Sequence, residues 1–261
     1  MSGNKTVVVT GGASGIGEAT VMRFAAAGWT VVIGDINVER AGIVAEAARE
    51  AGAAAVHVIP LDLADETSVA AFAERTDDEC GSVDAVVNSG GILQNGIRFN
   101  DMPVDEFDAV WRINVRGTLL INQAFGRRMT AAGSGSIINM CSLTTYRPSP
   151  QPAYAPAKVA LKSMTETMAA DFGPSGVRVN AVAPGYTLTP AMKARIDEGV
   201  RDPQAILDKS AIKRLVEPSD VAEAVFFLCS DAASAITGVV LPVDCGWLAY
   251  SAYTSYASQP G

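Results

Sequence analysis

The sequence predicts an α/β fold, in which a doubly wound parallel sheet of about seven strands has helices on both faces. Short, almost continuously apolar runs alternate with segments of helical periodicity, as expected for strands that are buried on both faces. The first run, 6–10, ends at a glycine-rich turn that leads directly into a helical pattern. No Pro/Ser-rich linker, repeat or low-complexity block interrupts the chain, so residues 1–261 are expected to form a single domain.

The order of the elements follows from the same patterns. Apolar, β-branched runs predict strands, and helical spacing of apolar residues predicts the helices between them. The expected strands are 6–10, 30–34, 54–59, 83–87, 136–140, 177–182 and 238–243. The expected helices are 18–27, 38–51, 65–80, 104–129, 158–172, 191–199 and 218–229. Residues 186–216 are expected to form an irregular substrate loop, and the aromatic tail 247–261 either caps an active site or is merely packed or frayed.

Composition limits the classes of partner. The net charge of −8 and the pI near 4.7 argue against binding to nucleic acid or to an anionic membrane surface. No apolar run reaches the length of a membrane span. The first residues lead straight into a predicted strand and leave no room for a signal peptide, so a cytoplasmic protein is expected.

The cysteines are expected to be free thiols, and no metal site is expected. None of them forms a Cys-x-x-Cys pair, and His57 is the only histidine. A nucleophilic Cys141 would need a histidine base, but His57 lies far away in sequence on an expected strand. The four cysteines are Cys80, Cys141, Cys229 and Cys245.

The glycine-rich turn has the context of a dinucleotide-binding loop in a Rossmann-like fold. Gly11-x-x-x-Gly15-x-Gly17 stands between a strand and a helix, where glycines let the backbone approach a pyrophosphate at the helix N-terminus. Asp35 ends the second strand, where it would accept hydrogen bonds from the adenosine ribose and repel a 2′-phosphate. No basic residue stands in the loop or directly after Asp35, which favours NAD over NADP as the cofactor.

Further polar residues follow the next strands. Asp62 would bond the adenine amino group or merely start a turn, and small residues at 88–91 would let a ribose or nicotinamide lie against the backbone. Asn114 is a poor helix former inside an expected helix, without an evident local reason.

A hydroxyl, a phenol and an ammonium occur within seventeen residues. Tyr154 and Lys158 are four apart and should share one helical face, so that the lysine draws the phenol pKa below its ordinary value of about 10. Ser142 would hydrogen-bond the same substrate oxygen. The spacing of Tyr154 and Lys158 alone also fits a solvated helix face, so the interpretation depends on the other motifs.

Together these motifs resemble the short-chain dehydrogenase/reductase family over about residues 5–246. The resemblance is carried by Thr10-Gly11-x-x-x-Gly15-Ile16-Gly17, Asn88-x-Gly90, Asn114, Ser142, Tyr154-x-x-x-Lys158 and Pro184-Gly185, in the order of the family. It implies that Tyr154 is the acid/base and that Lys158 lowers the Tyr154 pKa and holds the nicotinamide ribose. It also implies that Ser142 orients the substrate oxygen, and that Asn114 holds a water that links Lys158 to solvent as a path for the proton. The implied cofactor-binding residues are Gly11, Ser14, Gly15, Ile16, Gly17, Asp35, Asp62, Leu63, Asn88, Ser89, Gly90, Tyr154, Lys158, Pro184, Gly185, Thr187 and Thr189. Three positions differ from common family residues: Ser89, Cys141 and Pro156.

The resemblance also implies a homotetramer, with the 104–129 helix and the Tyr154 helix forming one interface. Substrate-facing residues are expected within 92–99, 143–151 and 186–211, where Arg147 either binds substrate or is solvated. The expected activity is an NAD-dependent exchange of a hydride with a secondary alcohol, whether a sugar or polyol, a hydroxy acid or a cyclic alcohol. The alternatives are an NADP(H)-dependent carbonyl reductase, disfavoured by Asp35, and a non-catalytic NAD-binding regulator, disfavoured by the intact catalytic set.

Overall fold

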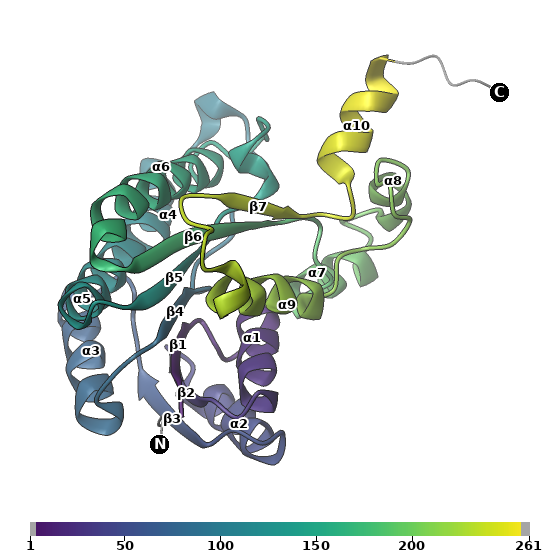
Figure 1. The fold of residues 1–261 in the computed structure, drawn as a ribbon. Coiled ribbons are helices and arrows are strands. Elements are labelled where there is room, and N and C mark those ends of the chain that lie inside the picture. The colour runs from purple at the N-terminus through teal and green to yellow at the C-terminus, as the bar shows by residue number, and fades with distance from the viewer. Residues whose placement is uncertain (1–3, 257–261) are drawn as a thin grey trace.

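The predicted parallel sheet is present in the computed structural model, which describes residues 4–256. Its seven strands lie in the order β3-β2-β1-β4-β5-β6-β7, and each neighbouring pair is parallel (Figure 1). The predicted strand ends agree with the observed ones to within two residues, which confirms the fold class. The strands are β1 (Thr6–Thr10), β2 (Thr30–Asp35), β3 (Ala55–Pro60), β4 (Ala85–Asn88), β5 (Gly135–Met140), β6 (Val177–Pro184) and β7 (Val240–Val243).

Helices cover both faces of the sheet because successive strand residues point to opposite faces and both sets are apolar. In β1, Val7 and Val9 pack in the core under α1, α2 and α9, whereas Val8 packs in the core under α3, α5 and α6. Figure 1 shows these two helical layers on either side of the sheet. The helices are α1 (Gly15–Ala26), α2 (Val38–Glu50), α3 (Glu66–Cys80), α4 (Val104–Trp111), α5 (Thr118–Ala132), α6 (Tyr154–Phe172), α7 (Pro190–Asp197), α8 (Pro203–Leu207), α9 (Pro218–Cys229) and α10 (Trp247–Tyr256).

The prediction of one long helix over 104–129 is wrong. A π-helical turn, Arg112–Gly117, separates α4 from α5. The wider turn directs Asn114 towards the loop after β4, where its carboxamide bonds the backbone of Ile92. This contact supplies the local reason that the sequence did not show for an asparagine within a helix.

The irregular segment 186–216 contains two helices, α7 and α8, of which only the first was predicted. Its two ends are tied together, because Thr187 and Val216 form an isolated parallel bridge and Leu188 N donates to Val216 O at 2.8 Å. The aromatic tail begins as α10, while residues 257–261 lie outside the described residues.

β7 is one of the two edge strands of the sheet, the other being β3. Its residue Pro242 has no backbone N–H, and the Tyr146 hydroxyl donates to the carbonyl oxygen of Val240 at 2.7 Å. Tyr146 therefore packs against the edge strand and lines neither of the two cavities described below, although it falls within a segment that was expected to face the substrate.

The chain topology fixes where a ligand can bind. The sheet order places β4 beside β1, so the chain reverses its direction of travel across the sheet between these strands. In open α/β sheets the crevice at this point, at the carboxyl ends of the strands, is the usual ligand site. Gly11 after β1 meets Gly90 after β4 so closely that a Cβ on Gly11 would lie 2.5 Å from the Gly90 Cα.

Candidate functional site

Two cavities meet at the carboxyl edge of the sheet. The glycine-loop cavity, about 620 Å³, runs from Gly11 and Asp35 to Lys158. The second cavity, about 370 Å³, lies between α7, the segment 142–151 and the start of α10. Both volumes are in the range of small-molecule sites, roughly 300–1,000 Å³. The residues lining both cavities are Ile16, Leu93, Met140, Tyr154, Thr189 and Ala191.

The glycine loop has the backbone that its sequence predicts. Gly11 and Gly15 have φ angles of +66° and +56°, which residues other than glycine rarely adopt. A Cβ on Gly17 would lie 2.0 Å from Gly11 O, so this glycine permits the close packing of the loop on α1. Ser14 and Ile16 line the glycine-loop cavity together with Gly11 and Gly15.

Asp35 ends β2 and lines the same cavity. Its two carboxylate oxygens accept the N–H groups of Ala13, at 3.0 Å, and of Asn37, at 2.9 Å. These bonds hold the carboxylate against the glycine loop and leave further lone pairs for ribose hydroxyls. Arg40 also lies beside the glycine loop, which was not predicted from the sequence. It donates to Ala13 O and pairs with both carboxylate oxygens of Glu18 at 2.9 Å, so its positive charge is neutralised.

Asp62 and Leu63 line the glycine-loop cavity after β3. One carboxylate oxygen of Asp62 accepts Ala64 N at 2.8 Å, so the turn role that the sequence allowed is present. The side chain nevertheless remains at the cavity wall, where its other lone pairs are available.

The residues after β4 divide into two groups. Ser89 and Gly90 line the cavity, but Asn88 does not. The buried Asn88 amide donates to the side-chain oxygens of Asn122 and Asn139, at 2.7 and 3.0 Å. The Asn88 side chain therefore points into the core and supports the loop from below, and the cofactor-binding role implied for Asn88 stays a prediction.

Asn114 is buried and lies behind the loop after β4. Its oxygen accepts Ile92 N at 2.8 Å and its nitrogen donates to Ile92 O at 2.9 Å. Both amide atoms are thus engaged with the backbone of one residue. The side chain fixes the loop that borders both cavities, and the water-holding role implied by the family stays a prediction.

Tyr154, Lys158 and Ser142 are brought together by α6 and the end of β5. Tyr154 is the first residue of α6, one turn before Lys158, and Ser142 hydrogen-bonds the phenol. Lys158 Nζ donates to Met140 O at 2.7 Å and lies 5.3 Å from the centroid of the Tyr154 ring. The predicted trio is therefore assembled where the two cavities meet.

Burial is the main influence on the pKa values of Tyr154 and Lys158. It raises the pKa of Tyr154 to about 12 and lowers the pKa of Lys158 to about 8. The Ser142 hydrogen bond acts against burial and lowers the pKa of the phenol. The expectation that Lys158 brings the Tyr154 pKa below its ordinary value is thus contradicted, because loss of solvent around the phenol outweighs the other influences.

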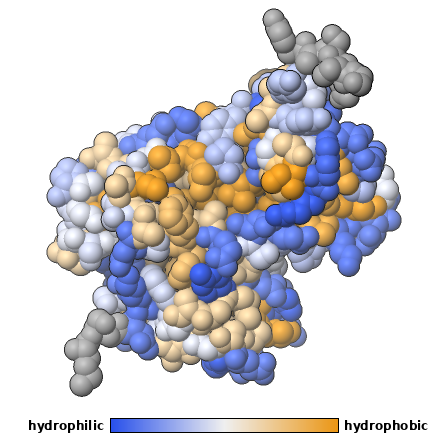
Figure 2. Space-filling model, turned by 45° about the vertical axis from the view of Figure 1, so that its right-hand side comes forward, coloured by the Kyte–Doolittle hydropathy of each residue, from blue (hydrophilic) through white to orange (hydrophobic). Residues whose placement is uncertain are grey.

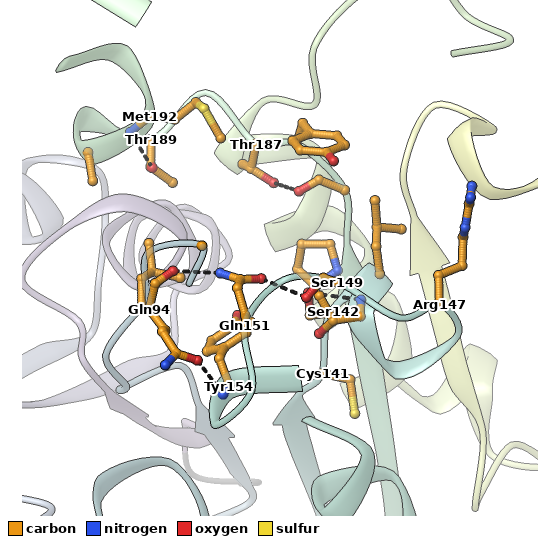
Figure 3. A pocket seen from close by; sticks show the side chains of 18 of the residues that line it. Gln94, Cys141, Ser142, Arg147, Ser149, Gln151, Tyr154, Thr187, Thr189 and Met192 are labelled. Atoms are coloured by element: carbon orange, nitrogen blue, oxygen red, sulfur yellow. Dashed lines mark hydrogen bonds between the residues drawn. The ribbon is translucent and has the colours of Figure 1, made fainter. Parts of the chain in front are cut away.

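Gln94 is a site residue whose role the sequence did not reveal. Its buried side-chain oxygen accepts Ala153 N at 2.9 Å and Tyr154 N at 3.1 Å, and these N–H groups open α6. Gln151 donates to the Gln94 backbone oxygen at 2.6 Å, so two loops are joined in front of Tyr154 (Figure 3). Gln94 lies within the segment 92–99 that was expected to face the substrate, and its carboxamide oxygen fixes the start of the helix.

The segment after β6 forms the far wall of the second cavity. Pro184, Gly185, Thr187 and Thr189 all line it, and the nicotinamide contact implied for them stays a prediction. The Thr189 hydroxyl accepts Met192 N at 3.3 Å and caps α7, while the Thr187 hydroxyl donates to Gly185 O at 3.1 Å. A Cβ on Gly185 would lie 2.8 Å from the Asp244 Cα, so the turn requires glycine.

Aromatic and basic residues form the rim of the second cavity. Tyr186 packs edge-on against Trp247, the first residue of α10, with 5.4 Å between ring centroids. Arg147 lies 4.8 Å from the Trp247 ring and donates to the Ser251 hydroxyl at 2.6 Å, so it is exposed but not simply solvated. The aromatic tail therefore contributes Trp247 to the cavity of its own chain.

The other candidate groups lie away from these cavities or play no part in them. All four cysteines are free thiols; of these only Cys141 lines a cavity, and burial raises its pKa. His57 lies in β3 and bonds Glu79 at 2.7 Å. Within residues 4–256, no group of three or more His, Cys, Asp and Glu side chains is arranged to hold a metal ion. No helix in this part of the chain has the length and apolar character needed to cross a bilayer.

Comparisons with known proteins agree with this geometry. The family model described as Enoyl-(Acyl carrier protein) reductase matches residues 11–248. Cis-4-hydroxycyclohexanecarboxylate dehydrogenase from Sinomonas cyclohexanicum is 42% identical over 246 residues, 94% of this chain and 97% of that protein. A crystal structure described as ribose-5-phosphate isomerase from Brucella melitensis 16M superposes with a TM-score of 0.92 at 39% identity, covering 97% of this chain and 96% of that one. The crystal structure of an NAD+-bound xylitol dehydrogenase gives a TM-score of 0.87 at 28% identity, with 93% and 99% covered.

Proposed function

Because the chain belongs to the short-chain dehydrogenase/reductase family, whose members use a nicotinamide dinucleotide, we propose that it is an NAD-dependent dehydrogenase of a secondary alcohol. The observation that carries the proposal is the meeting of the two cavities at Tyr154, beside Ser142 and Lys158. A substrate in the second cavity then has its carbinol oxygen at the phenol and its carbinol carbon facing the glycine-loop cavity.

The residues present fit the cofactor. Gly11, Ser14 and Gly15 line the glycine-loop cavity, with glycine φ angles that bring the backbone to its surface, and Asp35 stands at its adenosine end. We assign the pyrophosphate to Ser14, Gly15 and Ile16, and the adenine to Asp62 and Leu63. The remaining cofactor-binding assignments are Ser89, Gly90, Lys158, Pro184, Gly185, Thr187 and Thr189, with Gly17 and Asn88 in supporting positions. When bound, the nicotinamide ring accepts the hydride from the carbinol carbon.

The protein moves the proton. In oxidation, the Tyr154 phenolate removes the hydroxyl proton as the C–H bond breaks, which leaves a carbonyl compound and a neutral phenol. Ser142 donates to the substrate oxygen and to the phenol in turn. Lys158 lines the glycine-loop cavity, where it would hold the nicotinamide ribose. Since burial raises the Tyr154 pKa to about 12, oxidation is favoured at alkaline pH and reduction at lower pH.

Two features support NAD over NADP. Asp35 places a carboxylate where the adenosine ribose would lie, and a 2′-phosphate would meet its negative charge. Arg40, the base beside the glycine loop, already pairs with Glu18 and is not free to balance that charge. A carbonyl reductase that prefers NADPH is therefore the weaker alternative, and the intact catalytic trio argues against a non-catalytic NAD-binding regulator.

The relatives guide the choice of substrate. The name of the Sinomonas protein refers to a hydroxylated cyclohexane ring and that of the xylitol enzyme to a polyol, so both kinds of secondary alcohol belong in a first screen. The isomerase activity named for the Brucella protein is not transferred, because an intramolecular hydrogen shift has no use for the dinucleotide loop.

We propose a homotetramer in the cytoplasm. Helices α5 and α6 expose Leu119 and Val159, at 37% and 46%, where the family implies an interface. Figure 2 shows one face of the molecule, on which apolar residues also gather across the middle. Four free thiols suit a reducing compartment.

The proposal is tested by absorbance at 340 nm with NAD, then NADP, and a panel of cyclic alcohols, polyols and hydroxy acids. We expect NADH formation with at least one secondary alcohol, and Tyr154→Phe should lower kcat by about 10²–10⁴-fold. The same variant should keep the increase in Tm that NAD gives the native enzyme. Full activity in Tyr154→Phe would remove the assigned role of the phenol.

A further inference from the structure

Three arginines line the second cavity: Arg147, Arg195 and Arg201. Among the described residues that line it there is no aspartate and no glutamate. This concentration of positive charge runs against the composition of the chain, which has 28 acidic and 20 basic residues. Figure 3 shows Arg147 at the rim, on the opposite side of the cavity from Gln94.

None of the three has a carboxylate within ion-pair distance in residues 4–255, whereas arginines elsewhere do, as Arg214 with Asp220. The partners they have are neutral: Arg147 donates to the Ser251 hydroxyl and Arg195 to the side-chain oxygen of Asn95, each at 2.6 Å. Arg201 differs from both, because its Nε is buried and has no hydrogen-bond partner. A buried guanidinium N–H without an acceptor is costly and rare in native proteins.

Aromatic rings hold the guanidinium groups of Arg147 and Arg201 in place. Arg147 lies over Trp247, and Arg201 lies 5.5 Å from the Tyr186 ring, which itself packs on Trp247. Arg201 N donates to Arg195 O at 3.0 Å, which ties Arg201 to the last turn of α7. A guanidinium that stacks through its face keeps the N–H groups at its edge free for an oxyanion.

We propose that the second cavity recognises a substrate with an oxyanionic group, a carboxylate or phosphate, remote from the carbinol. Arg201 is the central hydrogen-bond donor to the oxyanion, and Arg147 and Arg195 add positive charge around it. Tyr154 lies at the other end of the substrate, beside the reacting alcohol. The inference rests on the proposed function for the orientation of the alcohol, but the anion subsite itself depends only on the arginines. A planar guanidinium matches a carboxylate or phosphate with two parallel hydrogen bonds.

The first experiment compares kcat/KM for 4-hydroxycyclohexanecarboxylate, its methyl ester and a cyclohexanediol monophosphate. We expect at least a tenfold preference for one of the two anions over the ester in the native enzyme, and which anion is preferred identifies the oxyanion. Arg201→Met should remove most of this preference by raising KM for the anion, with a much smaller effect on kcat/KM for the ester. The matched control, Arg127→Met on the exposed surface of α5, should leave all three rates unchanged.

The inference is overturned if the ester reacts as well as both anions, or if Arg201→Met lowers the rates for anion and ester equally. The second result would mean that Arg201 only supports the fold of the rim.

A binding measurement separates this inference from the proposed function. Calorimetry with cyclohexanecarboxylate, cyclohexyl phosphate and cyclohexanol requires no turnover. Binding of either anion that is lost in Arg201→Met upholds the subsite even if no alcohol is oxidised. If neither anion binds more tightly than cyclohexanol, the anion subsite is wrong even if the enzyme oxidises neutral alcohols.

Discussion

Gln94 holds the backbone of Tyr154: its carboxamide oxygen accepts the Tyr154 N–H at 3.1 Å and the adjacent Ala153 N–H at 2.9 Å. The first N–H groups of a helix have no partner within the helix, so a side chain from elsewhere must satisfy them when they are buried. A residue of the loop after β4 performs this function for α6. The position of the proposed acid/base is therefore fixed by a contact 60 residues away in the sequence.

Replacing Gln94 with leucine should leave these two N–H groups without an acceptor. We expect a loss of about 1–3 kcal/mol in the free energy of unfolding, or roughly 2–10 °C in Tm. The value of kcat should fall because Tyr154 is no longer held in place, while the affinity for NAD stays the same. Gln94→Glu keeps the acceptor and should retain more activity than Gln94→Leu. Equal Tm and kcat in native enzyme and Gln94→Leu would contradict this positioning role.

The pH profile should report the buried phenol. The phenol is protonated at neutral pH because burial raises its pKa to about 12, so the rate of oxidation should increase with pH and the rate of reduction should decrease. Ser142→Ala removes the hydrogen bond that lowers this pKa. The alkaline rise of kcat/KM should then move to higher pH, measured in both directions. A rise that stays at the same pH would exclude Ser142 as a group that tunes the phenol.

Lys158 should make stability depend on pH. Its pKa is about 8 in the folded protein against an ordinary value of 10.5, so between these values the unfolded chain binds more protons. The free energy of unfolding should therefore increase with pH across this window, by at most about 3 kcal/mol from this group. Denaturant unfolding at pH 7.5 and pH 10 measures the difference. Lys158→Met should reduce this increase, and an undiminished one would point to other groups.

Cofactor discrimination should depend on two acids. Asp35→Ala removes the charge that opposes a 2′-phosphate, so the ratio of kcat/KM for NAD to that for NADP should fall, by about tenfold or more. Arg40 remains paired with Glu18 in that variant. The double variant Asp35→Ala/Glu18→Gln frees the Arg40 guanidinium and should gain further NADP activity. Glu18→Gln alone serves as the control. If kcat/KM for NADP is no higher in the double variant than in Asp35→Ala, Arg40 has no part in cofactor discrimination.

Much of the fold was predictable because local patterns and tertiary structure agree. The strands are apolar on both faces and each is bounded by turn residues, so their number, order and approximate ends follow from the sequence. The glycine loop and Asp35 were predictable for the same reason, since backbone conformation there depends on glycines that are visible in the sequence.

What could not be predicted depends on contacts between distant segments. The π turn at 112–117 places Asn114 against the backbone of Ile92, and no local pattern indicates that contact. Gln94 and Arg201 are unremarkable in sequence, and each acquires its place from a loop that folds against α6 or Tyr186. The direction of the Tyr154 pKa shift was missed because helical spacing shows the lysine but not the degree of burial.

One of the two outer strands, β7, is protected against pairing with a strand of another molecule. An exposed strand edge can extend into a neighbouring molecule's sheet, which leads to open-ended aggregation. In β7, Pro242 contributes no donor and the Val240 carbonyl is already occupied by the Tyr146 hydroxyl. Recruitment of a further strand at this border is therefore discouraged.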